Sequence, residues 1–335
     1  MNKIKSIISI MMVSLVVNIT GCGKDEIKAP EIVSTKEVVN GGHIIVEATF
    51  DDASRMYFTI ISSNEAEVTY ANKFYFEDET DWKYEGDVVI PKEFTHYGQT
   101  YRVAGIGYIA FYGCESLTSV DIPETVSKYI FNGAFANCSE LVKVKMPSRL
   151  EELGEGAFSG CKKLASINLP EGMKAIYQQT FSSCESLTSI LIPNSVETIG
   201  FSAFALCKNM ESIEIPSVTT VAPWSFLGCE NLKEIKMPTM KYICQSAFAG
   251  CTSLSSVVLP ATTAEVMGHA FADCTSLTSV TCQATVPPIT YQPFEPDDDP
   301  FIGCPIQEIK VQPACVETYK TADGWKKYAD FIVGY

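Results

Sequence analysis

The pair Phe-x-x-Cys recurs along most of this 335-residue chain at a nearly constant interval of 22–24 residues. Its regular copies are Phe111 and Cys114, Phe135 and Cys138, Phe158 and Cys161, Phe181 and Cys184, Phe204 and Cys207, Phe226 and Cys229, Phe248 and Cys251, and Phe271 and Cys274. A further copy, Phe301 and Cys304, follows after 30 residues. A unit of this length cannot bury a core of its own. The interval therefore predicts units that stack in a row, with these phenylalanines and cysteines as their shared core.

Other apolar residues keep fixed places after each cysteine. A leucine (or Met210) comes three residues later, Ile or Val comes three residues after that, and in the first seven units a proline lies nine residues past the cysteine. Apolar and polar residues that alternate and end at a proline are typical of a short, half-buried strand. Parallel strands of stacked units lie about 4.8 Å apart, so eight units predict a rod about 35–40 Å long.

The unit A-F-x-x-C-x-x-L-x-x-I-x-L-P resembles the BspA-like leucine-rich repeats of bacterial and protist surface proteins, and the match covers about residues 106–284. The resemblance implies a mainly β fold, a right-handed leucine-rich-repeat solenoid of about eight repeats, and a role in adhesion to extracellular-matrix or partner-cell proteins. Cys282 takes a strand position and Gln283 stands where proline is expected. These departures predict that the ladder weakens at its last rung.

The apolar ends of a solenoid need a cover. Residues 42–105 contain strand-like segments such as Arg55–Ile61 and predict an N-terminal β cap. Residues 285–335 predict a loop followed by a C-terminal cap, with a strand at Ile306–Val311 and a short helical segment after it. Gly324 falls inside the helical pattern and is expected to break or bend it.

The first 21 residues are typical of a lipoprotein signal peptide. Two lysines precede an apolar run of 11 residues, Ile7 to Val17, which is too short to span a membrane as a helix. The run leads to Ile-Thr-Gly-Cys22, which resembles the bacterial lipobox, whose cysteine is acylated. An ordinary secretory signal that ends near a cysteine is the alternative.

Residues 23–26, Gly-Lys-Asp-Glu, resemble the surface-export tag of Bacteroides-type lipoproteins. Together the two resemblances imply a protein that is held on the outer membrane through lipidated Cys22 and exposed on the cell surface. Residues 22–41 are then expected to form a lipidated, solvated tether.

The repeat cysteines admit three interpretations. Zinc sites need cysteine or histidine pairs at short spacing, which this chain lacks, so no metal and no cofactor is predicted. Disulfides are favoured in an exported protein, and equivalent Cα atoms about 5 Å apart allow them. A single column of cysteines, however, has no preferred partners. We favour buried thiols that fill space and donate weak S–H hydrogen bonds to the turn backbone.

The strand residues beside each buried Ile or Val point away from the core and form a candidate binding face. They are Ser119, Asp121, Lys143, Lys145, Ser166, Asn168, Ser189, Leu191, Ser212, Glu214, Glu234, Lys236, Ser256, Val258, Ser279 and Thr281. The surface is long, shallow and mostly polar, which suits a broad protein partner. The alternative is that serine is only a tolerated solvent-facing residue there.

Charge and motifs exclude several function classes. The net charge of −15 argues against nucleic-acid binding, and none of the three histidines belongs to an H-E-x-x-H or G-x-S-x-G motif, so no enzyme is predicted. The favoured function is non-catalytic recognition or adhesion at the cell surface, with an extracellular or host protein as ligand. One alternative is a glycan-binding accessory protein of a nutrient-uptake system, for which Trp224 and Tyr177 are candidate contacts. Another is a purely structural envelope protein.

Overall fold

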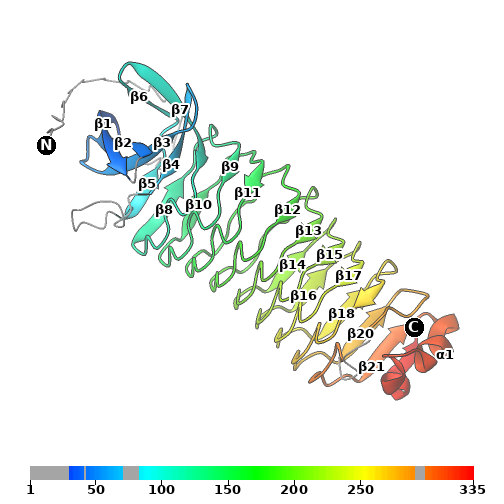
Figure 1. Cartoon of the computed structure of the whole chain (residues 1–335). Helices are drawn as coiled ribbons and strands as arrows, with labels where there is room; N and C mark the ends of the chain where they lie inside the picture. The colour runs from blue at the N-terminus through cyan, green and yellow to red at the C-terminus, as the bar shows by residue number, and fades with distance from the viewer. Residues whose placement is uncertain (1–29, 41–42, 71–82, 291–298) are drawn as a thin grey trace, which may run out of the picture.

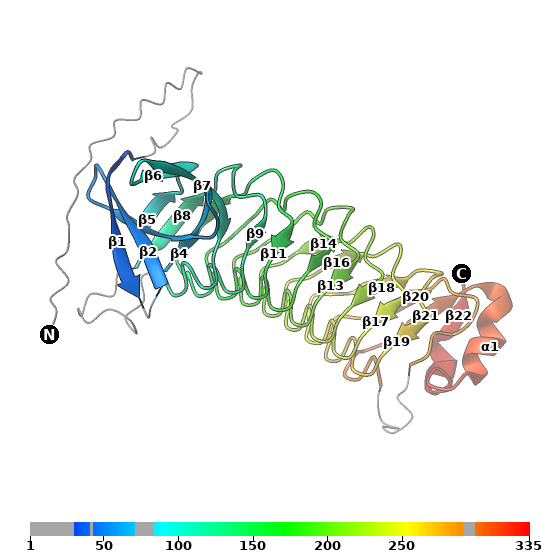
Figure 2. The ribbon, with the colours of Figure 1, turned by 45° about the horizontal axis from the view of Figure 1, so that its top comes forward.

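The computed structural model describes residues 30–40, 43–70, 83–290 and 299–335. The chain forms a row of similar coils, with a sheet at the N-terminal end and the helical segments at the C-terminal end (Figure 1). Each coil is called a rung, and rungs one to nine are numbered by their phenylalanines from Phe111 to Phe301. Strands lie along two sides of the coil, and Figure 2 shows both rows.

The first row, the front ladder, is parallel throughout, and in its third to fifth rungs only isolated bridges join the strands. Its strands are β5 (Gly86–Val89), β8 (Leu117–Asp121), β10 (Lys143–Lys145), β14 (Ser212–Glu214), β16 (Glu234–Lys236), β18 (Ser256–Leu259), β20 (Ser279–Cys282), β21 (Glu308–Val311) and β22 (Ile332–Gly334). In β18 and β20 buried residues alternate with exposed or half-buried ones, and every buried residue is apolar, whereas Val258 of β18 is apolar and exposed.

The second row, the rear ladder, consists of two-residue strands that pair in parallel. These are β9 (Tyr129–Ile130), β11 (Glu152–Leu153), β12 (Ala175–Ile176), β13 (Thr198–Ile199), β15 (Thr220–Val221), β17 (Tyr242–Ile243) and β19 (Glu265–Val266). In each strand the second residue is buried, so the strands contribute one apolar side chain per rung to the core.

The phenylalanine column runs through the whole stack. All nine rings are buried, neighbouring ring centroids lie 4.8–5.8 Å apart, and the ring planes agree within 16°. This separation follows from the spacing of neighbouring parallel strands, because each ring is fixed to its own rung. Stacking in register therefore places each internal phenylalanine between two others. The two end rings, Phe111 and Phe301, each contact one phenylalanine and an aromatic residue outside the column.

Each turn that carries a phenylalanine is closed by the next rung. The N–H of Phe111 donates to the carbonyl of Ala134 at 2.7 Å, and that of Phe135 donates to Ala157 at 2.8 Å. The residue two before each of the first eight phenylalanines has a positive φ, and so does the residue two after all nine. The backbone of each turn thus takes the left-handed conformation twice, at positions where glycine is favoured.

At the N-terminal end the strands are mostly antiparallel. They are β1 (Ile32–Asn40), β2 (His43–Phe50), β3 (Arg55–Ile60), β4 (Glu65–Thr69), β6 (Glu93–His96) and β7 (Gln99–Ile106). The order β1-β2-β3-β4-β7 continues into β9 of the rear ladder, and Tyr84 places its ring on Phe111 at 4.4 Å. The predicted tether is wrong over Ile32–Asn40, because this segment is the edge strand of the sheet and pairs antiparallel with β2, with one irregularity between Ile32 and Ser34.

At the C-terminal end the stack continues past residue 284. Phe301 stacks on Phe271 at 5.6 Å, and β21 pairs with β20 over four residues, so the ladder does not weaken at β20 as the sequence predicted. The buried side chain of Cys282 fills the strand position without interrupting the backbone ladder. The remaining elements are η1 (Pro313–Cys315), α1 (Val316–Thr321) and η2 (Lys326–Phe331). Gly324, at φ +78°, separates the two helical segments.

Candidate interaction surfaces

The structure places all sixteen residues of the predicted binding face on the outer side of the front ladder. None is buried, whereas the Ile or Val between each outward pair is buried. The alternation arises because successive strand residues point to opposite sides, so burial of one fixes exposure of its neighbours. That any of the sixteen contacts a ligand stays a prediction.

Polar side chains near both ends of the face are already paired. Ser119 donates a hydrogen bond to Asp87, and Lys145 forms an ion pair with Asp121 at 2.9 Å. At the far end Ser279 donates to Glu308 at 2.8 Å. These pairs hold neighbouring rungs together and leave fewer polar groups for a partner.

The middle of the face differs from its ends. The central patch comprises six residues of the third to fifth rungs, namely Ser166, Asn168, Ser189, Leu191, Ser212 and Glu214. Within the described part of the chain, none of their side chains forms a hydrogen bond or ion pair with another side chain. Leu191 is 82% exposed, and parallel bridges join it to Asn168 on one side and Glu214 on the other. The patch therefore presents an apolar side chain among unpaired polar groups.

The repeat cysteines lie inside the stack as thiols. From Cys138 to Cys304, each repeat Sγ donates to the carbonyl of the preceding rung's phenylalanine at 3.0–3.4 Å. All twelve cysteines among the described residues are free. Burial raises the pKa of the Cys161 and Cys229 thiols to about 12, which keeps them protonated. The S–H donor interpretation agrees with this geometry.

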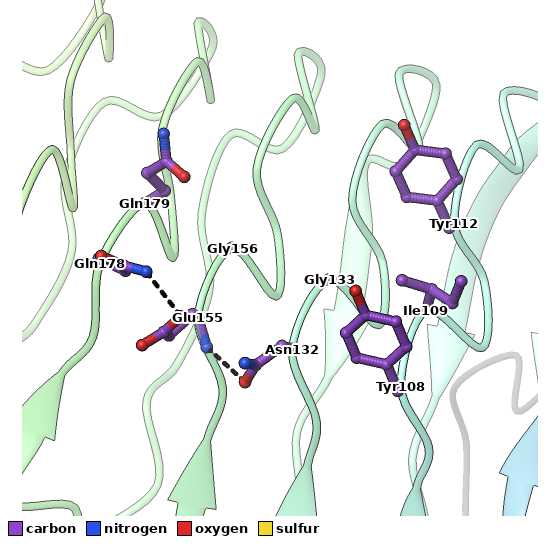
Figure 3. A pocket seen from close by; sticks show the side chains of 9 residues that line it. All are labelled: Tyr108, Ile109, Tyr112, Asn132, Gly133, Glu155, Gly156, Gln178 and Gln179. Carbon is purple, nitrogen blue, oxygen red and sulfur yellow. Dashed lines mark hydrogen bonds between the residues drawn. The ribbon is translucent and has the colours of Figure 1, made fainter.

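Sequence reasoning missed a groove on the turn side of the first four rungs. Its rim carries Tyr108, Tyr112, Asn132, Glu155, Gln178 and Gln179, and its volume is about 270 Å³ (Figure 3). Tyr108 and Tyr112 are 61% and 54% exposed. The available signal was the pair of tyrosines around the first repeat phenylalanine, together with glycine in the next two turns.

The two aromatic residues proposed from the sequence as glycan contacts lie elsewhere. Trp224 packs edge-on against Phe201 at 4.7 Å between ring centroids, and Tyr177 is not among the groove residues. The structure does not bring Trp224 and Tyr177 together as one flat platform.

The predicted lipid anchor and the predicted absence of a metal concern different parts of the chain. Cys22 and the signal segment lie outside the described residues. Within those that are described, no group of three or more His, Cys, Asp or Glu side chains is placed to hold a metal ion. The same residues contain no helix that is both long and apolar enough to cross a bilayer.

Parallel two-sided ladders around stacked phenylalanines define a leucine-rich-repeat type of protein. The family model described as the BspA type leucine rich repeat region matches residues 104–233 and 197–320. The chain therefore belongs to the BspA-type leucine-rich-repeat family. Proteins of this type are typically found at the cell surface, and leucine-rich-repeat proteins generally serve as non-catalytic binding scaffolds.

Several solved structures are similar to this chain. A leucine-rich-repeat protein of T. pallidum is 31% identical, with 62% of this chain and 86% of that chain covered and a TM-score of 0.49. A leucine-rich cell surface protein from Faecalibacterium prausnitzii is 21% identical, with 76% and 93% covered and a TM-score of 0.34. A Bacteroides ovatus leucine-rich-repeat protein is 23% identical, with 84% and 98% covered and a TM-score of 0.31. Among curated proteins no match was found.

Proposed function

We propose that this chain is a surface-attached recognition module that binds a protein partner through the front ladder. The central patch supports the proposal most directly, because Leu191 is the most exposed large apolar side chain among the described residues. Its equivalents on the neighbouring rungs are Asn168 and Glu214, so no shared structural requirement of the repeat places leucine there.

A partner would gain from this arrangement in two ways. Burying an exposed leucine side chain contributes about 1.5–3 kcal/mol when the water around it is expelled. The surrounding hydroxyl, amide and carboxylate groups are free to hydrogen-bond across the interface and to keep water away from the anchor. The rigid ladder holds these groups in place, which lowers the entropy cost of association.

Attachment to the outer membrane through lipidated Cys22 is part of the proposal. The lipobox-like sequence before Cys22 supports it, as does the usual surface location of the family. Labelled palmitate should be incorporated by cells that express the full chain and not by cells that express Cys22→Ala. Protease added to intact cells should degrade the chain if it faces outward. Label retained by Cys22→Ala would contradict the anchor.

The binding surface is tested with immobilised extracellular-matrix proteins. We expect Leu191→Glu to weaken binding at least about tenfold, since it removes the apolar anchor and adds a desolvation cost. Glu214 occupies the equivalent place one rung on, so the substitution suits the fold. Val286→Glu, which alters an exposed residue outside the front ladder, is the matched control. The proposal fails if no matrix protein binds, or if both variants bind as the parent does.

A further inference from the structure

The groove on the turn side arises from one column of residues. The position two before each phenylalanine is occupied in rungs one to eight by Ile109, Gly133, Gly156, Gln179, Ser202, Trp224, Ser246 and His269, all at positive φ. Only rungs two and three have glycine, so the column lacks side chains there. Ile109 and Gln179 bound the gap, which spans three rung spacings or about 14 Å.

The floor of this gap has room for a ligand. A Cβ added at Gly156 would meet only the Cβ of Ser159, at 3.8 Å, within 4 Å. At Gly133 the nearest atom would be the Cγ2 of Ile109, at 3.2 Å, so that side chain forms one wall. The groove therefore forms where two successive rungs lack a side chain. Ile109 and Gln179 are its walls, and the backbone of the two glycines is its floor.

The aromatic wall comes from a strained turn. Ile109 is β-branched, yet its φ is +48°, a conformation that is a genuine outlier for such residues. Its N–H donates to the carbonyl of Asn132 at 3.1 Å, and its own carbonyl accepts from Tyr112 at 3.0 Å, which hold the turn in place. Tyr108 and Tyr112 lie beside Ile109 and Gly133 at this end of the gap (Figure 3). Strain of this kind is retained where a surrounding structure enforces it and clusters at functional sites.

The polar rim is held in position before any ligand arrives. Gln178 Nε2 donates to Glu155 Oε2 at 2.6 Å, and the backbone N–H of Glu155 donates to Asn132 Oδ1 at 3.0 Å (Figure 3). These bonds leave the amide N–H groups of Asn132, the second oxygen of Glu155 and the amide oxygen of Gln178 without a hydrogen-bond partner among the described residues. Donors and acceptors fixed in this way favour binding because little side-chain freedom is lost.

The chemistry of the rim selects a class of ligand. It contains no lysine, arginine or histidine, and Glu155 is acidic, so phosphate, sulfate and carboxylate groups are disfavoured. Two exposed tyrosine rings offer flat apolar faces with a polar tip, and amides and a carboxylate offer both donors and acceptors. Neutral sugars match this combination, because their rings carry apolar C–H faces and hydroxyls that both donate and accept.

We propose that this groove binds a short stretch of a neutral glycan chain. The tyrosines stack on the sugar rings, while Asn132, Glu155 and Gln178 hydrogen-bond the hydroxyls. The open, shallow shape admits a chain that continues beyond the groove at either end. The site lies on the turn side of rungs one to four and shares no residue with the central patch.

The test fills the gap with a side chain that the next rung already carries at the same turn position. Gly156→Gln places in rung three the side chain that rung four already carries as Gln179, at φ values of +60° and +55°. We expect it to weaken binding to neutral glycans at least about tenfold. Ser246→Gln introduces the same side chain in the same column at rung seven, outside the groove, and should bind as the parent does. Tyr108→Ala should also lose about tenfold, with Tyr177→Ala as its control, because removing an aromatic platform removes its stacking contact.

The full chain is assayed on an array of neutral oligosaccharides of glucose, mannose, galactose and xylose beside sialylated and sulfated glycans. Binding to neutral members that is lost in Gly156→Gln and Tyr108→Ala, and kept in both controls, supports the proposal. The proposal is overturned if no neutral glycan binds, if only acidic glycans or immobilised proteins bind, or if Gly156→Gln and Tyr108→Ala bind normally. Leu191→Glu should leave glycan binding unchanged, which separates this site from the front ladder.

Discussion

The interior and the outer wall of the stack follow different rules. Inside, every rung repeats the same phenylalanine, and the rings lie nearly parallel from Phe111 to Phe301. Outside, equivalent positions of adjacent rungs carry an amide (Asn168), an apolar side chain (Leu191) and a carboxylate (Glu214). A residue in the interior must fit the rungs above and below it, whereas a residue on the wall meets solvent. Repetition therefore marks the scaffold, and differences between rungs mark the places where function can reside.

The position two before each phenylalanine, called here the turn column, is set partly by the interior and partly by the outer surface. Its backbone is fixed by the interior, since the positive φ recurs in the first eight rungs. Its residues vary from glycine to tryptophan, and apart from buried Ser202 its side chains are half-buried or exposed. A non-glycine residue in this column adopts a left-handed backbone at a steric cost. Gly133 and Gly156 adopt it without that cost, and because they carry no side chain they leave the groove.

The largest expected effect is on the interior. Phe181 is fully buried between Phe158 and Phe204, at 5.8 and 5.4 Å between ring centroids. Phe181→Ala should lower the free energy of unfolding by about 3–5 kcal/mol, because it removes the ring from both neighbours and leaves a cavity. Tyr177→Ala, on the wall of the same rung, should change it by about 0.5 kcal/mol or less. Urea unfolding followed by circular dichroism measures both, and similar losses would contradict the distinction.

Thiol reactivity provides the second comparison. Because burial raises the pKa of Cys161 from 9.0 to about 12, its thiolate fraction at mildly alkaline pH should fall about a thousandfold. The repeat thiols of the native chain should therefore react slowly with a thiol reagent, with half-buried Cys244 more accessible. After denaturation without reductant, all repeat thiols should react at once. If most remain blocked until a reductant is added, the cysteines are disulfide-bonded and the thiol interpretation is wrong.

Ion pairs on the surface of the N-terminal sheet should contribute less to the free energy of unfolding, and their contribution should depend on pH. Hydrogen bonds from Lys128, at 2.6 Å, and from Arg102 hold the pKa of Glu65 below its ordinary value of 4.5. A lowered folded pKa stabilises the fold above the unfolded pKa, and this contribution is lost as the pH falls through the folded pKa. Glu65→Gln should cost about 1 kcal/mol at neutral pH and progressively less in acid.

The control for this change is Glu152→Gln. Glu152 is exposed in β11 and has no ion pair among the described residues. Unfolding free energies of the parent and both variants are compared from neutral to acidic pH. A deficit for Glu65→Gln that stays constant across that range would show that the loss is not electrostatic.

The repeat columns were predictable from the sequence because burial imposes one residue type on every rung. Phe-x-x-Cys and the alternating strand residues gave the stack, its core and its outward face. The strand β1 was not predictable in the same way. Its segment Ile32–Asn40 contains serine, lysine and glutamate, and it is a strand because it pairs with β2. The local sequence does not predict that pairing. The copy at Phe301 was recognised from the sequence, but the longer interval before it led residues 285–335 to be assigned to the C-terminal cap instead of the stack.

The two candidate sites differ in the same respect. Strand alternation placed Leu191 on the outward face, although its exposure of 82% needed the structure. The groove required the knowledge that one turn column has a positive φ and points outward, since glycine in two neighbouring units otherwise signifies only a turn. Tyr108 and Tyr112 become a wall only when Gly133 and Gly156 are known to lie beside them.

The smallest expected effect has the opposite sign and tests the turn backbone itself. Ser183 stands at φ +59° in the column where Gly160 has φ +74°, so its backbone conformation is one that glycine adopts without steric cost. Ser183→Gly should raise the free energy of unfolding by about 0.5–1 kcal/mol, since relief of left-handed strain outweighs the entropy that glycine adds to the unfolded chain. Ser182→Gly, one residue earlier and not at positive φ, should lower it. If both substitutions destabilise the chain, the left-handed backbone at Ser183 holds no strain that glycine relieves.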